Sequence, residues 1–313
     1  MRIMVTGGAG FIGSNLVWTL VGAGHDVLVI DDMSTGRVEN LHPASSFRTL
    51  DILAPELAGV LAEFAPDVVV HLAAQTSVPA SVADPEHDWT VNVEGTRAVA
   101  RAAVAANVKR VLSASSAAVY GEPAVIPLPE TAEKSPINPY GRSKLAAESV
   151  LAEELRGTAT DFASFRFANV YGPRQDWQGE GGVVAIFTAK MHANEAATVY
   201  GSGLQTRDFI YVGDIVGGIL DAIDAEVPLA GAGEDGPAYN LSTGTRLSVN
   251  ELVAHVRSAT RYAGEIVYAD AREGDIEHSA LDPTKAHETF GFLARVPVDV
   301  GIAQTVKWFA RRS

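Results

Sequence analysis

The chain has 313 residues, 47% of them hydrophobic, which is enough for one large α/β domain or two smaller ones with a sizeable core. Its formal net charge of −14 at pH 7 argues against nucleic acid and anionic membranes as partners, because both require a basic surface. There is no cysteine, so disulfides and thiolate chemistry are excluded and no metal site is expected, and no apolar run is typical of a signal peptide or membrane span, which predicts a cytoplasmic protein.

A glycine-rich turn connects the first two predicted elements. The apolar residues 3–5 predict a strand, and apolar side chains at helical spacing in residues 15–20 predict a helix. Gly7 and Gly10 allow the backbone between them to turn tightly and approach a phosphate, and Gly13 allows the helix to pack close to the strand. The free N–H groups at the start of the helix then face a pyrophosphate.

An acidic residue follows the second predicted strand. The apolar run at residues 27–30 ends in Asp31, eighteen residues after Gly13, near the position where a dinucleotide fingerprint places an acid for the adenine ribose. A glycine turn without a ligand is the alternative interpretation, but the setting between two strands, followed by an acid, favours dinucleotide binding. Because a carboxylate at this position repels a 2′-phosphate, we expect NAD as the cofactor and not NADP.

Strands and helices alternate up to about residue 170. Strands are expected at 47–50, 67–72, 111–116 and 162–167, and helices at 54–64, 84–106 and 145–155. The small residues that follow the strand at 67–72 suit a cofactor crevice, whereas His71 within it is expected to be a packed core histidine. Asp51 is placed to flank the adenine, although its pattern favours a cap for the helix at 54–64.

A tyrosine and a lysine follow a proline-rich loop at 122–139. Tyr140 and Lys144 are four residues apart and share one face of a helix. An ammonium group beside a phenol stabilises the phenolate, and a positively charged nicotinamide adds to this effect. We therefore expect the pKa of Tyr140 to fall toward the working pH, which suits a general base. The alternative is an ordinary pair on a helix surface.

Beyond residue 170 the predicted helices and strands become shorter and no longer alternate regularly. Helices are expected at 183–191, 214–223 and 249–259, the last one capped by Ser248, and short strands at 198–200, 210–212 and 239–241. This change in pattern predicts a small second lobe that closes over the first.

Taken together, the motifs resemble those of the extended short-chain dehydrogenase/reductase family, and within it the NAD-dependent nucleotide-sugar epimerases and dehydratases. The resemblance covers nearly the whole chain and implies a doubly wound parallel sheet (Rossmann) that binds NAD in residues 1–170. Some later segments return to this sheet, and residues 171–313 mainly form a smaller mixed α/β lobe for the nucleotide sugar. The motifs are Gly7-x-x-Gly10-x-x-Gly13, Asp31, residues 71–74, 115–121, Tyr140-x-x-x-Lys144, 169–174 and 205–209.

The resemblance also implies individual roles. Tyr140 matches the catalytic tyrosine, Lys144 its partner that also holds the nicotinamide ribose, and Ser116 the group that hydrogen-bonds O4 of the sugar. The implied substrate contacts are Ser116, Asn169, Arg207 and Arg272, of which the last three hold the diphosphate, with Asp275 on the uridine ribose, Val183 and Tyr200. The implied NAD contacts are Gly7, Gly10, Phe11, Ile12, Gly13, Asp31, Asp32, Ser34, Gly36, Asp51, Ile52, Leu72, Ala73, Ala74, Asn92, Tyr140 and Lys144.

One departure from the family pattern bears on the reaction. Relatives that eliminate water or decarboxylate carry acidic residues directly after the Ser116 position, where this chain has Ala117 and Ala118. Without a carboxylate there, proton abstraction at C5 has no agent. The expected activity is therefore inversion at C4 of a UDP-sugar through a 4-keto intermediate, which interconverts UDP-glucose and UDP-galactose.

Several alternatives stay open at this point. One is a UDP-glucuronate 4-epimerase, in which Arg174, Thr76 or Ser77 would hold the C6 carboxylate, and UDP-N-acetylglucosamine and dTDP-sugars are others. A non-catalytic NAD-binding regulator is a different class, against which the Tyr140 and Lys144 pair and the negative charge both argue. The resemblance further implies a homodimer that pairs through residues 84–106 and 140–155, while the sequence leaves a monomer open.

Overall fold

A computed structural model describes residues 1–122, 125–178, 182–231, 236–271 and 276–311. Within them, seven parallel strands form one sheet in the order β11-β6-β5-β4-β1-β2-β3. This is the expected α/β class with a doubly wound parallel sheet. The strands are β1 (Arg2–Thr6), β2 (Asp26–Asp31), β3 (Ser46–Thr49), β4 (Val68–His71), β5 (Arg110–Ser116), β6 (Asp161–Phe167) and β11 (Ala238–Leu241).

Helices cover both faces of this sheet. Successive side chains of a strand point to opposite sides, so the apolar strands present a hydrophobic surface on each face that must be buried. Ile3 and Val5 of β1 face one hydrophobic core and Met4 faces another. With both faces buried, the strands are continuous apolar runs. The first core is closed by α1 (Phe11–Gly22), α8 (Val212–Asp224) and α10 (Thr284–Phe290), and the second by α2 (Leu57–Phe64), α5 (Gly95–Ala105) and α6 (Pro139–Leu155).

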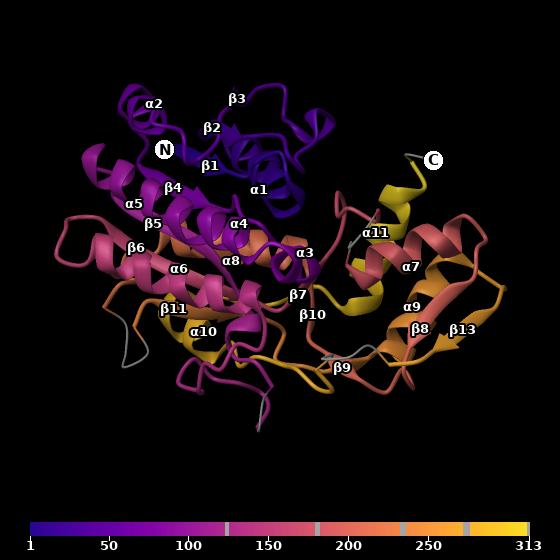
Figure 1. Ribbon diagram of the computed structural model, residues 1–313. Coiled ribbons are helices and arrows are strands. Elements are labelled where there is room, and N and C mark those ends of the chain that lie inside the picture. The colour runs from indigo at the N-terminus through magenta and orange to yellow at the C-terminus, as the bar shows by residue number, and fades with distance from the viewer. Residues whose placement is uncertain (123–124, 179–181, 232–235, 272–275, 312–313) are drawn as a thin grey trace.

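A smaller group of elements lies beside the sheet (Figure 1). Its own hydrophobic core contains residues of α7 (Val183–His192), α9 (Val249–Thr260) and α11 (Val298–Phe309). Its strands pair as β8 (Ala197–Tyr200) with β13 (Ile266–Ala269), β7 (Asn169–Tyr171) with β10 (Phe209–Tyr211), and β9 (Thr206–Arg207) with β12 (Leu247–Ser248). Of the helices in the described part of the chain, none is both long and apolar enough to cross a membrane.

Three elements differ from the sequence expectation. The helix expected at 84–106 is divided into α4 (Pro85–Trp89), a π-helical segment η2 (Thr90–Glu94) and α5, and α3 (Val78–Ala83) precedes it. Asp51 does not cap α2, which begins only at Leu57; its carboxylate accepts a hydrogen bond from Leu53 N at 2.8 Å within a turn. The helix expected from residue 145 begins at Pro139, because Asn138 caps it by accepting from Gly141 N at 2.8 Å.

His71 is the buried core histidine that the sequence predicted. On β4, its two ring nitrogens lie 2.7 Å from Thr6 Oγ1 and 3.2 Å from Thr96 Oγ1. Burial, and to a lesser degree the charge of Lys144, lowers the pKa of His71 to about 3. The imidazole therefore stays neutral in the folded protein at pH values where it is protonated in the unfolded chain.

This difference predicts a loss of stability in mild acid. A histidine with a lowered folded-state pKa contributes stability above its unfolded pKa of 6.5, and this contribution is lost as the pH falls toward 3. At pH 5 the loss relative to pH 8 is about 2 kcal/mol of unfolding free energy. Replacing His71 with Gln should remove this part of the pH dependence, as measured by urea unfolding at the two pH values. His192→Gln, on an exposed helix end, is the control and should keep the parent's dependence; equal slopes in both variants would contradict the assignment.

Candidate active site

The glycine turn between β1 and α1 is packed so closely that Gly7 and Gly13 admit no side chain. Gly7 has a φ of +70°, and a Cβ there would lie 2.6 Å from Ala73 N at the end of β4. A Cβ on Gly13 would lie 2.1 Å from Gly7 O. No side chain in the described residues caps the N-terminus of α1, so the N–H groups at Phe11 and Ile12 point from an uncapped helix end. This cradle fits a pyrophosphate.

Asp31 braces this turn from the end of β2. Its buried carboxylate accepts hydrogen bonds from Ala9 N and Met33 N, both at 2.9 Å. Burial raises the pKa of Asp31, and the two backbone hydrogen bonds oppose the rise. A Cβ on Gly36 would lie 2.5 Å from Asp31 Oδ1, so glycine is required there. The loop is held further by Asp32, which accepts from Ser34 N at 2.9 Å.

The remaining expected NAD contacts follow β3 and β4 or lie beside them. Because the strands are parallel, their carboxyl ends meet at one edge of the sheet. Asn92, in the π-helical segment, binds the chain after β4: its Oδ1 accepts from Gln75 N at 2.9 Å, and its Nδ2 donates to Gln75 O at 3.1 Å. The expected contacts gathered at this edge are Asp51 and Ile52 after β3, and Leu72, Ala73 and Ala74 after β4.

Ser116, Tyr140 and Lys144 meet at the end of β5. The side chains of Ser116 and Tyr140 are hydrogen-bonded to each other. Lys144 is buried, and its Nζ donates to Ala114 O of β5 at 3.1 Å. A Cβ on Gly141 would lie 2.5 Å from Ala118 O, so glycine at this point lets α6 approach the end of β5. The structure thus brings the three expected catalytic side chains together.

The electrostatics of this trio differ from the expectation for Tyr140. Burial raises the pKa of Tyr140, the hydrogen bond to Ser116 lowers it, and the charge of Asp88 raises it again. Burial also lowers the pKa of Lys144 to about 8, against the opposing charges of Asp88 and Glu148. The expected fall in the tyrosine pKa is therefore wrong for the protein groups alone, because the cost of burying a phenolate outweighs the help from its neighbours.

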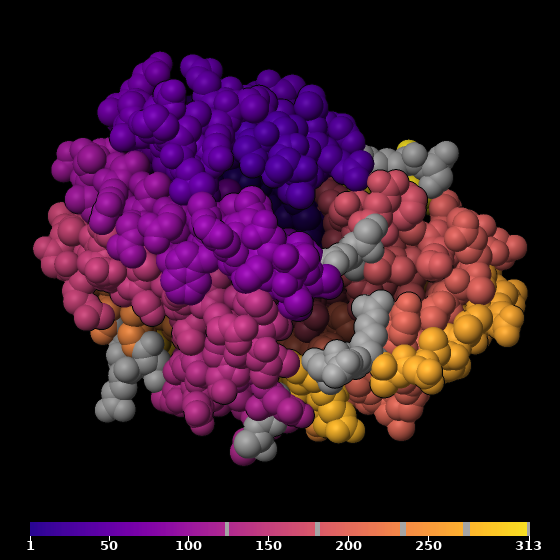
Figure 2. Space-filling model, in the orientation of Figure 1, coloured from indigo at the N-terminus to yellow at the C-terminus, as the bar shows by residue number. Residues whose placement is uncertain are grey.

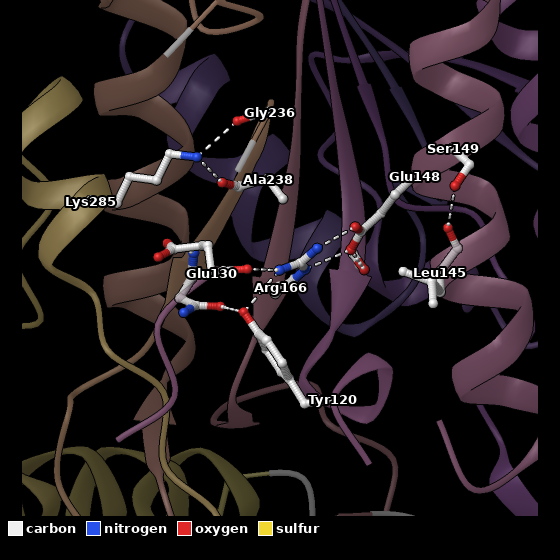
Figure 3. Close-up of polar contacts among 11 residues, drawn as sticks. Tyr120, Glu130, Leu145, Glu148, Ser149, Arg166, Gly236, Ala238 and Lys285 are labelled. Carbon is white, nitrogen blue, oxygen red and sulfur yellow. Dashed lines mark hydrogen bonds and ion pairs between the residues drawn. The ribbon is translucent and has the colours of Figure 1, made fainter. Parts of the chain in front are cut away.

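A buried ion pair fixes the helix that carries Tyr140 and Lys144 (Figure 3). Arg166 of β6 binds Glu148 of α6 with two hydrogen bonds, Nη2 to Oε2 at 2.7 Å and Nε to Oε1 at 2.9 Å. Ser115, the residue before Ser116, also donates to Glu148. Glu148 lies one turn after Lys144, so this contact sets how α6 lies against β5 and β6.

The same guanidinium also belongs to a chain of hydrogen bonds that ends on β11, the outermost strand beside β6. Arg166 Nη1 donates to the Tyr120 hydroxyl at 2.9 Å, and that hydroxyl donates to Asn240 Oδ1 of β11 at 2.8 Å. Glu130 adds its carboxylate, which accepts from Asn240 N at 2.7 Å. None of these residues was assigned a role from the sequence, although Tyr120 lies within the motif at 115–121. The sequence feature that could have indicated this network is the charged residue within the apolar run at 162–167, since a buried arginine requires a buried acidic partner.

Apart from Ser116, the expected substrate residues within the described part of the chain lie on the smaller group of elements. Figure 2 shows a hollow in the molecular surface between this group and the N-terminal part of the chain. Asn169 begins β7, Val183 begins α7 and Tyr200 ends β8. Arg207 ends β9, and its Nη1 donates to Thr206 O at 2.9 Å. Asn169 N donates to Asp208 O at 2.9 Å, which places Asn169 and Arg207 close together.

Arg272 and Asp275 lie outside the described residues. The described residues on either side of them are held against Tyr200 and Arg207. Gly201 N donates to Ala269 O at 2.8 Å, and Thr206 N donates to Glu277 O at 3.0 Å. The chain before and after Arg272 and Asp275 therefore runs beside the other expected substrate residues.

Two of the groups considered for a sugar carboxylate are engaged elsewhere. Arg174 donates to Asn15 Oδ1 at 3.1 Å, and its guanidinium lies 4.9 Å from the ring centroid of Trp18, so it packs on α1. Ser77 caps α3, where its hydroxyl accepts from Ala80 N at 3.0 Å. Thr76 is exposed in the preceding loop. This arrangement offers little support for binding a carboxylate-bearing sugar.

Comparison with known proteins places the chain among nucleotide-sugar enzymes. The model of the NAD dependent epimerase/dehydratase family matches residues 3–241. A UDP-glucose 4-epimerase from Mycolicibacterium smegmatis is 42% identical over 319 residues, covering all of both chains. The structure of a UDP-glucose 4-epimerase from Thermotoga maritima with UDP-glucose has a TM-score of 0.94 and 38% identity, covering 100% of this chain and 99% of the other.

A second solved structure widens the range of substrates in this group. It is a UDP-N-acetylglucosamine 4-epimerase from Methanobrevibacter ruminantium in complex with UDP-N-acetylmuramic acid, with a TM-score of 0.93 and 31% identity, covering 100% of this chain and 99% of the other. The glycine cradle, the trio at the end of β5 and these full-length matches agree. The chain belongs to the NAD-dependent epimerase/dehydratase family, as an enzyme of nucleotide-sugar epimerase type.

Proposed function

We propose that the protein is a UDP-sugar 4-epimerase that interconverts UDP-glucose and UDP-galactose through a 4-keto sugar. The observation that carries the proposal is the hydrogen-bonded pair of Ser116 and Tyr140 beside Lys144, followed directly by Ala117 and Ala118. The Ser116 and Tyr140 pair can remove the proton of a sugar hydroxyl group and return it. The two alanines provide nothing that abstracts a proton from C5.

The side chains at the end of β5 divide the proton chemistry among them. Ser116 and Tyr140 share a hydrogen bond, so both hydroxyl groups can face O4 of the sugar, and Tyr140 accepts its proton and later returns it. Lys144, held at Ala114 O, supplies a positive charge that stabilises the phenolate. The glycine cradle at Gly7, Gly10 and Gly13 would hold NAD, which would supply the hydride acceptor and donor for C4.

Inversion requires both faces of C4 to be presented in turn. The protein must therefore hold the nucleotide firmly and the sugar loosely. Arg207 and Asn169 are neighbours on the smaller group of elements and are suited to hold the diphosphate, Arg207 through the paired donors of its guanidinium. Of the carboxylates that act on Lys144, Glu148 is paired with Arg166, and Asp88 accepts hydrogen bonds at Oδ1 from Gln75 and Asn92. This leaves simple oxidation and re-reduction at C4 as the supported chemistry.

UDP-N-acetylglucosamine is the second candidate substrate. The likeness to the Methanobrevibacter ruminantium enzyme, at a TM-score of 0.93 over the whole chain, favours it as the alternative. UDP-glucuronate has weaker support, because Arg174 packs on α1. The three substrates differ at C2 or C6, so direct conversion assays separate them.

The homodimer and the cytoplasmic location stay predictions. The dimer would use the outer faces of α5 and α6, which pack side by side (Figure 1). Glu154 of α6 joins the two helices, since it accepts from Arg97 at 2.7 Å and from Arg101 at 2.9 Å. These contacts make the two helices one continuous surface.

Replacing Tyr140 with Phe should lower turnover by about 10³-fold, because general acid–base catalysis contributes effects of this size. Binding of UDP, measured by calorimetry, should change little, since the phenol faces the sugar. Tyr268→Phe, which removes a hydroxyl from the exposed strand β13, is the matched control and should keep full turnover. Near-normal turnover in Tyr140→Phe would overturn the assignment.

The substrate is decided by incubating the protein separately with UDP-glucose, UDP-glucuronate and UDP-N-acetylglucosamine, without added NAD, and separating the products by chromatography. We expect UDP-galactose from the first and no change in the second. Product from the third alone would establish the alternative substrate. Conversion of UDP-glucuronate, or of none of the three, would contradict the proposal.

A further inference from the structure

Asp88 is a buried carboxylate for which the proposed chemistry has no direct use. It lies on α4 and is 1% exposed. Its Oδ1 accepts from Gln75 Nε2 at 2.6 Å and from Asn92 Nδ2 at 3.2 Å. Its Oδ2 is buried and has no hydrogen-bond partner among the residues that the structure describes. Burying a carboxylate oxygen without a partner is unfavourable for folding, so a residue of this kind requires another explanation.

The hydrogen bonds of Asp88 connect two parts of the active site. Gln75 continues the chain after β4, where NAD contacts are expected at Ala73 and Ala74. Asn92 Nδ2, which donates to Asp88, also lies 3.0 Å from Ser143 Oγ on α6. Asp88 and Asn92 therefore tie the expected cofactor edge of the sheet to the turn of α6 that lies between Tyr140 and Lys144.

The charge of Asp88 also acts on Lys144. The titratable groups that face Lys144 are Asp88 from α4, Glu148 and Tyr140 from α6, and His71 from β4. His71 is neutral, and Glu148 is already paired with Arg166 through two hydrogen bonds. Asp88 has no cation within ion-pair distance in the described part of the chain, and it is the largest influence that opposes the lowering of the Lys144 pKa by burial.

We propose that Asp88 is a positioning residue: its carboxylate keeps the Lys144 ammonium charged, and its hydrogen bonds fix the end of β4 relative to α6. The role in catalysis rests on the proposed function, because Lys144 matters there through its positive charge. Asp88 does not contact the reacting atoms. Because no donor offsets the charge at Oδ2 among the described residues, more of the field of the Asp88 carboxylate acts on Lys144.

The test is a titration of Lys144 in the full-length protein as purified. The chain has six lysines, so lysine labelled with ¹³C at Cε gives few NMR signals, and the one lost in Lys144→Met identifies Lys144. In Asp88→Asn the midpoint of the Lys144 titration should fall by about one pH unit, a tenfold rise in its acid dissociation constant. The basic limb of the pH profile of kcat should move to lower pH with it.

Asp84→Asn is the matched control. Asp84 is the exposed cap of the same helix, where its carboxylate accepts from His87 N at 3.0 Å, and asparagine caps equally well. This variant removes one negative charge from α4 and should leave the Lys144 midpoint unchanged. If Asp88→Asn does not fold, Asp88→Ser removes the charge without burying an amide and is measured in the same way.

The outcomes are separable from those of the function assays, because the titration requires no sugar nucleotide. A Lys144 midpoint that is the same in the folded Asp88 variant and in the parent overturns the inference and leaves the proposed function standing. A shifted midpoint in a protein that converts no UDP-sugar supports the charge effect and overturns the proposed function instead. An equal shift in Asp84→Asn would show a general effect of charge and would also overturn the inference.

Discussion

The site depends on one close backbone contact, between Gly7 and the end of β4. The two backbones approach so closely that a single methyl group at position 7 would lie 2.6 Å from Ala73 N. This contact places the glycine turn beside the strand ends where the other expected cofactor residues lie. Asp31 reinforces it, since its carboxylate accepts from Ala9 N within the turn. A dinucleotide cradle thus results from the absence of side chains at a few points and from one buried acid.

Buried charges determine how the second half of the site is built. Arg166 and Glu148 join α6 to β6 with two hydrogen bonds, and Ser115 adds a link from β5. Removing one partner of such a pair leaves an uncompensated charge in the interior, which is strongly destabilising. The ion pair therefore holds the helix of Tyr140 and Lys144 in one position. Rigid support of this kind is what proton transfer at a fixed atom requires.

The protein groups alone do not make Tyr140 a strong base. Burial raises its pKa, and among the described residues the hydrogen bond with Ser116 lowers it. Lys144 is itself close to losing its proton, with a pKa of about 8. A positive charge placed beside Tyr140, such as that of an oxidised nicotinamide, would favour its phenolate form.

The sequence by itself determined the features that depend on residues close together in the chain. Local backbone requirements predicted the glycine turn and the acid after β2. The repeat of side-chain direction along strands and helices predicted that His71 lies in the core and that Tyr140 and Lys144 share one face of a helix. Helix boundaries were less well determined. The start of α6 at Pro139 depends on the Asn138 cap, and the π-helical segment at Thr90–Glu94 has no sequence period of its own.

Tertiary structure alone decided which distant residues meet. Asp88 meets Gln75 because α4 packs on α6 and on the π-helical segment, and Glu148 meets Arg166 because α6 packs on β5 and β6. Arg174 packs on α1, although its position in the sequence also suited a sugar contact. Such contacts join residues that are far apart in the chain, and no local pattern encodes them. Their energies come from burial and charge compensation, which exist only after the layers have packed.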